Sequence, residues 1–318
     1  PETLPRMHPI PFSRRNFLAT TSSLALTGCA NLQQLARPLP YVDSHVHLWT
    51  SDTEAYPIAE GLDPKAVMTP PRFTDADLLA TCQPEGVGRI VLIQMSFYKA
   101  DNRYMLDRIA TAPSVFRGVA ILDHENEPDA VRQEMHRLKP LGVPGFRLYA
   151  FAENVAKWPD QPGLHAIWEE AVITGQAVCL LADPEVLPTI EAMCIRYPGT
   201  KVVIDHFARI GMKEGPTSPH LQALLRLARF PKVHVKLSAF YALGRKSAPY
   251  TDMEPIISTL CEHFGPSRLM WGSDCPYQLA KGHSYRDSID VFRRHCAFLS
   301  RTERADILGG TASRIFFS

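Results

Sequence analysis

The chain has 318 residues, of which 45% are hydrophobic and 21% are charged, a composition typical of a globular protein with one large core. Its formal net charge of +1 excludes the strongly basic surface of a nucleic-acid-binding protein, so we expect no nucleic-acid partner. No apolar run reaches the roughly 18 to 20 residues that span a bilayer. The only membrane contact that we expect is a lipid anchor near the N-terminus.

The first forty residues have the pattern of an export segment. Ser13-Arg14-Arg15-Asn16-Phe17-Leu18 precedes a short apolar stretch over residues 19–26, as in a twin-arginine signal. The next residues, Leu26-Thr27-Gly28-Cys29, resemble the lipobox of bacterial lipoproteins, whose cysteine is lipidated. We predict a signal over residues 1–28, a tether over 29–40, a periplasmic location and lipidation at Cys29. The alternative is an unstructured basic tail with an incidental cysteine.

The remaining cysteines do not form a disulfide framework. None belongs to a C-x-x-C pair, and a chain of this length has a core that needs no disulfide bonds. We expect most of them to be small buried side chains, and they are Cys82, Cys179, Cys194, Cys261, Cys275 and Cys296.

An apolar segment over residues 41–49 is predicted to be the first strand. Side chains alternate along a strand, so Asp43, His45 and His47 are expected on one face. Two imidazoles at this spacing form a ligand pair suited to zinc. The chain has twelve histidines, so a His-x-His spacing can also arise by chance.

Residues 51–72 are polar and rich in proline, and a connection of this length is typical of a segment that covers an active site. A helix follows it. Thr74 is predicted to be the N-cap of this helix, with Asp75 and Asp77 in the first turn, where acidic side chains are favoured.

From here apolar strands and amphipathic helices alternate regularly. Strands are predicted at residues 41–49, 89–94, 116–122, 145–149, 177–181, 201–205, 233–237 and 269–271. After the first helix, further helices are predicted at residues 102–112, 129–141, 164–174, 184–197, 219–228, 253–264 and 285–299. This alternation predicts an α/β fold, a single-domain (β/α)8 TIM barrel over residues 41–318. No G-x-G-x-x-G motif follows a strand, which argues against a dinucleotide-binding fold.

Barrel enzymes place their chemistry at the carboxyl ends of the strands. Polar residues at the predicted strand ends are His45, His47, Asp123, His124, Arg147, Asp205, His206, Arg209, Lys236, Asp274 and Tyr277. His234 lies inside the seventh strand and is expected in the core. His283 lies in the last barrel loop, and the sequence leaves undecided whether it reaches a site.

Three motifs carry a family resemblance: D-S-H-V-H-L at residues 43–48, I-D-H at 204–206 and W-G-S-D-C-P at 271–276. In this order and spacing the chain resembles the amidohydrolase superfamily. Within it, the pattern is similar to the amidohydrolase-2 branch that contains 2-pyrone-4,6-dicarboxylate lactonase and L-fuconolactonase. The resemblance covers the chain from Tyr41 to Phe317, including the final segment at 307–316.

The resemblance implies roles for four residues. His45 and His47 are the paired ligands on the first strand, His206 is the histidine after the sixth strand, and Asp274 handles the proton of the attacking water. Two departures bear on the metal. The fifth strand ends in Leu-Leu-Ala-Asp at 180–183 instead of a histidine, and Arg147 stands where binuclear members have a bridging lysine. We therefore predict one divalent ion, zinc first, or none; His206 and Asp274 are further candidate ligands.

These residues suit hydrolysis of a lactone, because opening a cyclic ester requires an activated water and a stabilised oxyanion. Asp274 is predicted to be the general base, with a pKa raised by burial. The imidazoles of His45, His47 and His206 are predicted to polarise the carbonyl, either directly or through a metal ion.

The predicted substrate contacts are Arg147, Arg209, Lys236 and Tyr277, and they indicate a carboxylated or sugar-derived lactone. For Arg147 and Lys236 the alternative is an internal ion pair with Asp43, Asp123 or Asp205. For Arg209 it is an exposed loop position, and for Tyr149 and Tyr277 it is core packing.

Two other functions remain open at this point. One is metal-dependent non-oxidative decarboxylation, which the same superfamily performs with a fuller set of ligands. The other is a non-catalytic, exported binding protein. The sequence makes no prediction of the oligomeric state.

Overall fold

The structure, a computed structural model, describes residues 41–212 and 219–318. The predicted export signal, the tether and Cys29 lie outside these residues. Within the described ranges, none of the helices combines the length and the hydrophobicity needed to cross a bilayer.

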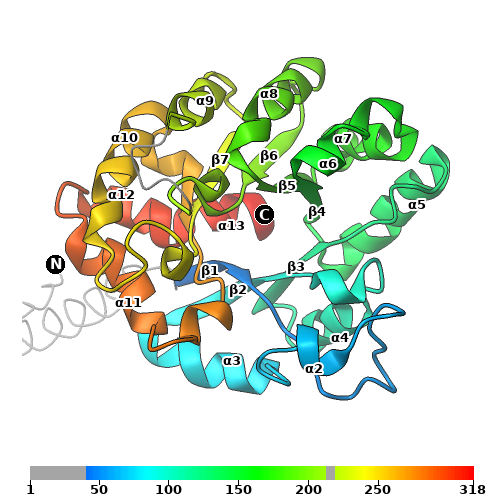
Figure 1. The fold of residues 1–318 in the computed structure, drawn as a ribbon, viewed down its shortest axis with the longest axis horizontal. Helices are drawn as coiled ribbons and strands as arrows, with labels where there is room; N and C mark the ends of the chain where they lie inside the picture. Colours follow the sequence, from blue (N-terminus) through cyan, green and yellow to red (C-terminus); the bar gives the residue numbers. More distant parts are fainter. Residues whose placement is uncertain (1–40, 213–218) are drawn as a thin grey trace, which may run out of the picture. The chain divides into compact units, whose positions relative to one another are not determined.

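Eight parallel strands form one sheet in the order of the sequence, and Figure 1 shows the helices outside them. The strands are β1 (Tyr41–Val46), β2 (Val87–Ile93), β3 (Phe116–Ala120), β4 (Gly145–Ala150), β5 (Ala177–Ala182), β6 (Lys201–Ile204), β7 (Val233–Leu237) and β8 (Leu269–Trp271). The chain after β8 meets β1, because His47 N donates to Cys275 O at 2.8 Å and Asp274 N donates to His45 O at 2.8 Å. The predicted TIM barrel is confirmed.

The helices also follow the predicted alternation. They are α2 (Pro64–Val67), α3 (Asp75–Cys82), α4 (Arg103–Thr111), α5 (Pro128–Leu138), α6 (Ala152–Val155), α7 (Pro162–Thr174), α8 (Leu187–Arg196), α9 (Leu221–Arg226), α10 (Glu254–Phe264), α11 (Tyr285–Asp290), α12 (Arg301–Ala305) and α13 (Thr311–Phe316). The helix predicted at 285–299 is shorter than expected, because α11 gives way to a π-helical turn over Val291–His295.

The predicted start of α3 is confirmed. The Thr74 side chain accepts a hydrogen bond from Asp77 N, and the Asp77 carboxylate accepts one from Thr74 N at 2.9 Å. This reciprocal pair satisfies two backbone donors that a helix start leaves free. It also fixes where the long connection after β1 ends.

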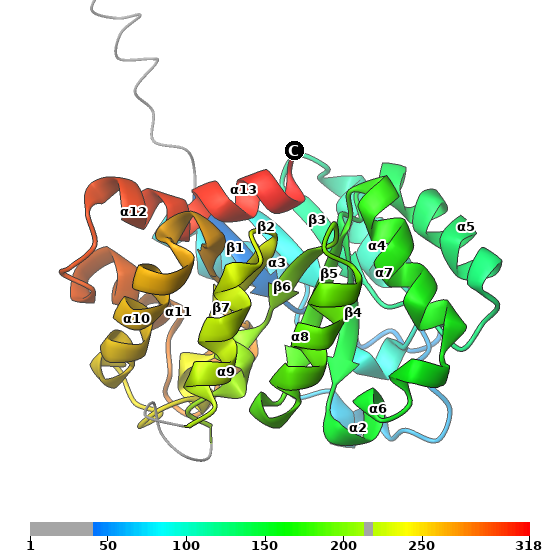
Figure 2. The same ribbon diagram turned by 90° about the horizontal axis from the view of Figure 1, so that it is seen from above.

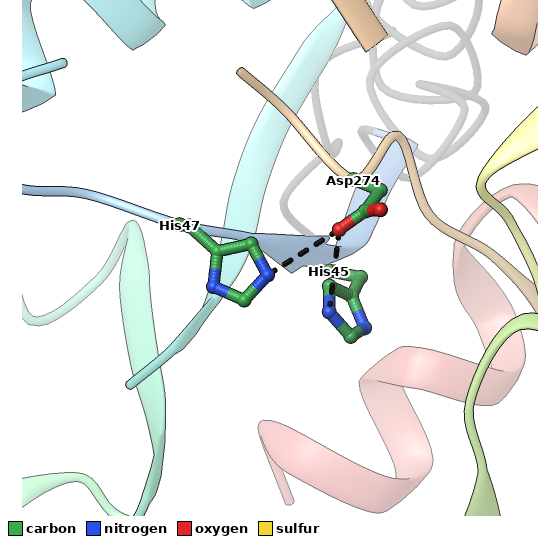
Figure 3. Close-up of side chains that lie close together, drawn as sticks. All are labelled: His45, His47 and Asp274. Carbon is green, nitrogen blue, oxygen red and sulfur yellow. Dashed lines mark ion pairs between the residues drawn. The ribbon is translucent and has the colours of Figure 1, made fainter. Parts of the chain in front are cut away.

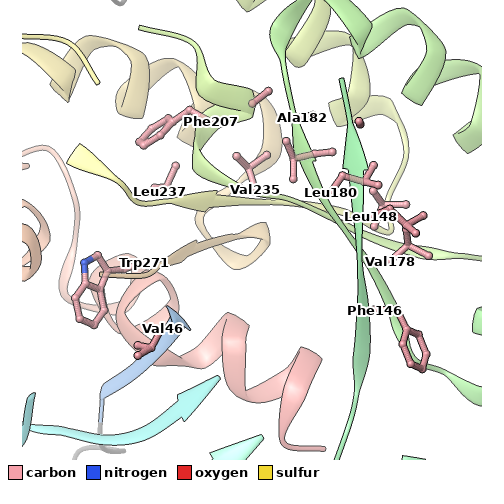
Figure 4. Packing of buried hydrophobic residues seen from close by; sticks show 14 of the residues in the cluster. Val46, Phe146, Leu148, Val178, Leu180, Ala182, Phe207, Val235, Leu237 and Trp271 are labelled. Carbon is pink, nitrogen blue, oxygen red and sulfur yellow. The ribbon is translucent and has the colours of Figure 1, made fainter. Parts of the chain in front are cut away.

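Two apolar layers cover the two faces of the sheet, as expected for strands buried on both sides. The layer toward the helices includes the side chains labelled in Figure 4, among them Val46, Phe146, Leu148, Val178, Leu180, Val235 and Leu237. The layer inside the barrel consists of smaller strand residues near the amino ends, with Phe316 of α13 against them. The polar inward residues therefore gather toward the carboxyl ends.

The cysteines and His234 lie as predicted. The six cysteines in the described ranges are free thiols, and all are buried except the half-buried Cys261. His234 is buried, and its Nδ1 lies 3.0 Å from Lys232 O. None of these side chains is among the described residues that line the cavity at the carboxyl ends of the strands.

Candidate active site

A β-bulge in β1 separates Asp43 from the two histidines. Asp43 is paired with Ile90 and Val46 with Leu92, so three residue steps in β1 match two steps in β2. The extra residue reverses the alternation of side chains beyond it. The prediction that Asp43 shares a face with His45 and His47 is therefore wrong.

Asp43 instead holds the chain around β1 in place. Its Oδ1 accepts hydrogen bonds from Ser273 N at 2.9 Å and His45 N at 3.1 Å, and its Oδ2 accepts one from the Tyr285 hydroxyl at 2.7 Å. Burial raises the pKa of Asp43 to about 6. This carboxylate joins β1 to the segment before Asp274 and to α11.

His45, His47 and Asp274 meet at the mouth of the barrel (Figure 3). His47 Nε2 lies 3.3 Å and His45 Nε2 lies 3.6 Å from Asp274 Oδ1, and the two imidazole centroids are 5.0 Å apart. His47 Nδ1 lies 2.9 Å from Ile93 O, which can only accept a hydrogen bond. In a neutral His47 the proton is therefore on Nδ1, and the Nε2 lone pair faces the carboxylate.

The other oxygen of Asp274 faces His206 and a tyrosine. His206 Nε2 lies 3.9 Å from Asp274 Oδ2, and His206 Nδ1 lies 2.8 Å from the Ser238 hydroxyl. The Tyr241 hydroxyl donates to Asp274 Oδ2 at 2.7 Å. Sequence reasoning missed Tyr241, although its position in the loop directly after β7 was the signal that identified the other residues at strand ends.

The backbone of this site adopts the left-handed region at several non-glycine residues. Asp274 has φ 63°, and His206, Phe207, Ala208 and Arg209 have φ between 52° and 57°. Left-handed backbone costs about 1–2 kcal/mol per residue for L-amino acids. Strain of this kind clusters at functional sites, where the surrounding structure holds it, and here it occurs at both predicted catalytic residues.

A buried ion pair lies on the other side of the His45 ring. Lys236 Nζ is 3.1 Å from Asp205 Oδ1 and 3.3 Å from His45 Nδ1, and His45 Nδ1 is 3.5 Å from Asp205 Oδ1. Lys236 and Asp205 are both 0% exposed. The structure does not bring Lys236 to the cavity described below; it forms the internal ion pair that the sequence left as the alternative.

Arg147 lies between the Lys236–Asp205 ion pair and the mouth of the barrel. Its Nη1 lies 3.2 Å from His45 Nε2 and 3.8 Å from Asp205 Oδ2, while its buried Nε has no hydrogen-bond partner. Burial and the adjacent Lys236 ammonium hold the pKa of His45 well below its ordinary value, so its ring is neutral at pH 7.

The pKa of Asp274 differs from the prediction. Burial disfavours its ionised form, but the imidazoles of His206, His47 and His45 around the carboxylate outweigh burial and lower the pKa below its ordinary value. The expectation of a raised pKa is wrong, because desolvation was considered without the three imidazoles around the carboxylate. Asp274 is therefore ionised at neutral pH.

A cavity of about 290 Å³ opens over these residues at the carboxyl ends of the strands. His47, His206 and Asp274 border it, together with Arg147, Arg209 and Tyr277 from the predicted substrate contacts. Its remaining wall is largely apolar and aromatic, and includes Met95, Tyr149, Phe151, Leu181, Met212, Tyr241 and Leu243. Among residues in the described ranges, the strand-end pair Asp123 and His124 does not line it.

Arg209 and His283 have partners of their own. Arg209 Nη1 donates to Asp183 Oδ1 at 2.6 Å, and its guanidinium lies 5.4 Å from the centroid of the Phe151 ring. His283 Nδ1 lies 2.7 Å from the Tyr250 hydroxyl, outside the cavity lining. Arg209 therefore lines the cavity while its guanidinium forms an ion pair with Asp183.

The connection after β1 does not cover this cavity. It packs beside it, where Ala59 N donates to Phe97 O at 2.7 Å and the Trp49 indole donates to Pro70 O at 2.8 Å. No residue of 51–72 is among the described residues that line the cavity. The prediction that this segment covers the site is wrong, because Gln94, Met95 and Ser96 of the loop after β2 line the cavity instead.

The donor set at the mouth fits one divalent ion. His45, His47 and Asp274 can each offer one ligand atom, and these atoms lie within 4.8 Å of one another. Two imidazole nitrogens and a carboxylate oxygen are a usual zinc set. The lone pair of a neutral His47 and the Asp274 oxygen are both acceptors, so a cation between them is chemically favourable.

Comparison with known proteins agrees with this geometry. The model of the Amidohydrolase family matches residues 42–317. The chain is 30% identical over 284 residues to an L-fucono-1,5-lactonase of Burkholderia ambifaria, covering 86% of this chain and 94% of that protein. It is 28% identical over 267 residues to a 2-pyrone-4,6-dicarboxylate hydrolase of Comamonas testosteroni, covering 81% and 84% respectively.

A solved structure shows the same fold. An amidohydrolase of Burkholderia multivorans with bound zinc superimposes with a TM-score of 0.74 at 22% identity, covering 88% of this chain and 99% of that one. The family match spans every strand of the barrel and all the residues that meet at its mouth. The chain therefore belongs to the amidohydrolase family.

Proposed function

We propose that this protein hydrolyses a lactone that carries an anionic group, with Asp274 as the base. The observation that supports this most is the Asp274 carboxylate itself. It is 5% exposed, borders the cavity, and has three imidazoles and a tyrosine hydroxyl within 3.9 Å. The relatives named lactonase and pyrone-dicarboxylate hydrolase act on cyclic esters, which is the chemistry that such a carboxylate supports.

Asp274 takes one proton from a water molecule while the water oxygen attacks the lactone carbonyl. The hydrogen bond from Tyr241 holds Oδ2, which leaves Oδ1 facing the imidazoles of His45 and His47. When the ring C–O bond breaks, Asp274 returns the proton to the alkoxide that leaves. The product is an open-chain hydroxy acid, and the carboxylate is regenerated.

The oxyanion of the tetrahedral intermediate lies against donors from β4 and from the segment after β6. His206 can donate from Nε2 because Ser238 can supply a hydrogen bond to its Nδ1. Arg147, which lines the same cavity, supplies a fixed positive charge. A divalent ion held by His45, His47 and Asp274 would polarise the same carbonyl oxygen as a Lewis acid.

Arg147 determines the substrate class in this proposal. Its side chain is 5% exposed and borders the cavity, and its ion pair with Asp205 is long at 3.8 Å, whereas Arg209 is held by Asp183 at 2.6 Å. The centroid of the Tyr149 ring lies 5.6 Å from the Arg147 guanidinium, and Phe151 and Tyr277 line the same cavity. A flat, unsaturated lactone with a carboxylate fits this wall better than a polyhydroxylated sugar lactone, which needs more hydrogen-bonding side chains.

The test compares three substrates: 2-pyrone-4,6-dicarboxylate, L-fucono-1,5-lactone and a neutral lactone without a charged group. We expect the largest kcat/KM for the first. Arg147→Gln should lower it about 100-fold, because a bidentate charge-assisted contact is lost. Arg147→Lys, the matched control, keeps the charge without the fork and should lose less.

Failure to open any lactone, with or without added zinc, would contradict the proposal. Release of CO2 from an aromatic acid without lactone opening would favour the decarboxylase instead. Ligand affinity that survives replacement of Asp274 and the histidines, with no turnover of any lactone, would favour a binding protein.

We also propose that the protein is exported and anchored through Cys29. The support is the Arg14-Arg15 pair followed by an apolar stretch and Leu26-Thr27-Gly28-Cys29. Expression of the full chain in a bacterium, followed by fractionation, should place it with the membrane. Cys29→Ser should release it, and an unchanged distribution would contradict the anchor.

A further inference from the structure

A second cavity, of about 310 Å³, lies at the amino ends of the strands, away from Asp274. It is bounded by the segments that lead into β4 and β5, by the start of β6 and by the end of α13. Figure 2 shows α13 at this end of the barrel. Arg117, Lys139 and Lys201 line it, and none of the described residues in its wall has an acidic side chain.

These three cations have no ionic partner. Among residues 41–212 and 219–318, the ion pairs do not include any of them. Arg117 donates to the carbonyl oxygens of Pro113 and Phe116 and lies 5.1 Å from the centroid of the Phe317 ring, which are all uncharged contacts. Burial and the nearby ammonium groups of Lys232 and Lys139 lower the pKa of Lys201. No acidic side chain in the described wall compensates the positive charge of these three side chains.

Only one of the three cations lies where a helix dipole stabilises a positive charge. Lys139 directly follows the carboxyl end of α5, where a positive side chain is favoured. Arg117 is the second residue of β3 and Lys201 the first residue of β6, and sheets have only small net dipoles. Arg117 and Lys201 therefore line a cavity whose described wall has no acidic side chain.

A buried amide in the same wall offers a hydrogen-bond acceptor to a ligand. Gln176 lines the cavity and is 1% exposed. Its Nε2 donates to Val143 O at 2.8 Å, which fixes the orientation of the amide, and its Oε1 has no partner. A buried acceptor without a donor destabilises the folded protein. A ligand with a hydroxyl group would supply that donor.

We propose that this cavity binds a phosphate group that carries a hydroxyl, either hydrogen phosphate or a small phosphate monoester such as a glycerol phosphate. Arg117 and Lys201 contact the phosphate oxygens, since guanidinium and ammonium groups both bind phosphate. The ligand hydroxyl donates to Gln176 Oε1. The site is separate from the hydrolytic centre, because its residues belong to the opposite ends of the strands.

Calorimetric titration of the full chain at low ionic strength tests this site. Inorganic phosphate and glycerol 3-phosphate should both bind, and sulfate, which lacks the hydroxyl at neutral pH, should bind more weakly. Lys201→Gln and Arg117→Gln should each weaken phosphate binding about tenfold, the usual loss for one charge-assisted hydrogen bond. Lys65→Gln removes the same charge from the exposed helix α2 and should leave the affinity unchanged.

The binding measurements distinguish a soluble phosphate compound from the phosphate of a lipid headgroup. Binding of the free compounds supports a soluble ligand, and binding only to vesicles that contain phosphatidic acid supports a lipid headgroup. No binding of either kind, or equal weakening by Lys65→Gln, would overturn the site. Equal affinity for sulfate would overturn the role of Gln176. Lactone turnover should be unchanged in Lys201→Gln, so the result is independent of the proposed function.

Discussion

Two carboxylates lie on opposite sides of the His45 ring, in regions that differ in exposure and in the groups around the carboxylate. Asp205 Oδ1 is 3.5 Å from His45 Nδ1, and Asp274 Oδ1 is 3.6 Å from His45 Nε2. Asp205 is 0% exposed and faces the cations Lys236 and Arg147. Asp274 borders the cavity and is surrounded by imidazoles and a hydroxyl group.

The comparison shows that distance from the histidine does not distinguish a reactive carboxylate from a structural one. The charge of Asp205 is balanced by fixed cations, and no substrate can reach it. The charge of Asp274 is held by groups that can themselves donate or accept a proton. Access to the cavity and neighbours that can carry a proton, not distance from His45, support the proposal that Asp274 is the base.

The largest effect is expected from Asp274→Asn, which tests whether Asp274 is the reactive carboxylate of the two. The amide keeps the shape but cannot take a proton from water, so kcat should fall by about 10²- to 10⁴-fold, the usual contribution of a general base. Binding of a product analogue should survive, as measured by calorimetry. A variant with unchanged turnover would remove Asp274 from the mechanism.

Asp205 lies on the other side of the His45 ring, and Asp205→Asn should lower the free energy of unfolding. It leaves the fully buried Lys236 ammonium without its carboxylate, which should cost about 3–5 kcal/mol of unfolding free energy. Urea denaturation followed by circular dichroism measures this loss. The double variant Asp205→Asn with Lys236→Met removes both charges and should recover most of it. A single variant as stable as the parent protein would show that the pair is not structural.

The smallest expected effect belongs to Tyr241→Phe. Loss of one hydrogen bond to the Asp274 carboxylate should lower kcat about tenfold, because an interaction with a charged group is worth about 1.5–3 kcal/mol. KM should change little, since the hydroxyl bonds the base and not the substrate. Tyr277→Phe, which removes a hydroxyl from the same cavity without touching Asp274, is the matched control. Equal losses in both variants would contradict the specific role of Tyr241.

Much of the fold was predictable because it depends on local pattern. Apolar strands that alternate with amphipathic helices are visible in any window of the sequence, and all eight predicted strands are present. The ends of the strands then identified His47, His206, Arg147 and Asp274 as neighbours. The cap at Thr74 was predictable for the same reason, since its partners lie within three residues.

The errors arose where the outcome depends on distant residues. The bulge that turns Asp43 away is a mismatch between β1 and β2, and neither strand shows it alone. Lys236 pairs with Asp205 because β6 and β7 are neighbours in a closed barrel. The lowered pKa of Asp274 results from imidazoles contributed by β1 and by the loop after β6.

The sequence by itself determined the barrel and the set of residues at its mouth, because hydrophobic periodicity and strand polarity are local properties. Only the tertiary structure decided which of those residues face a cavity, which neutralise one another and which were overlooked, such as Tyr241. Those outcomes depend on register and on contacts between segments far apart in the chain, and no local pattern specifies them.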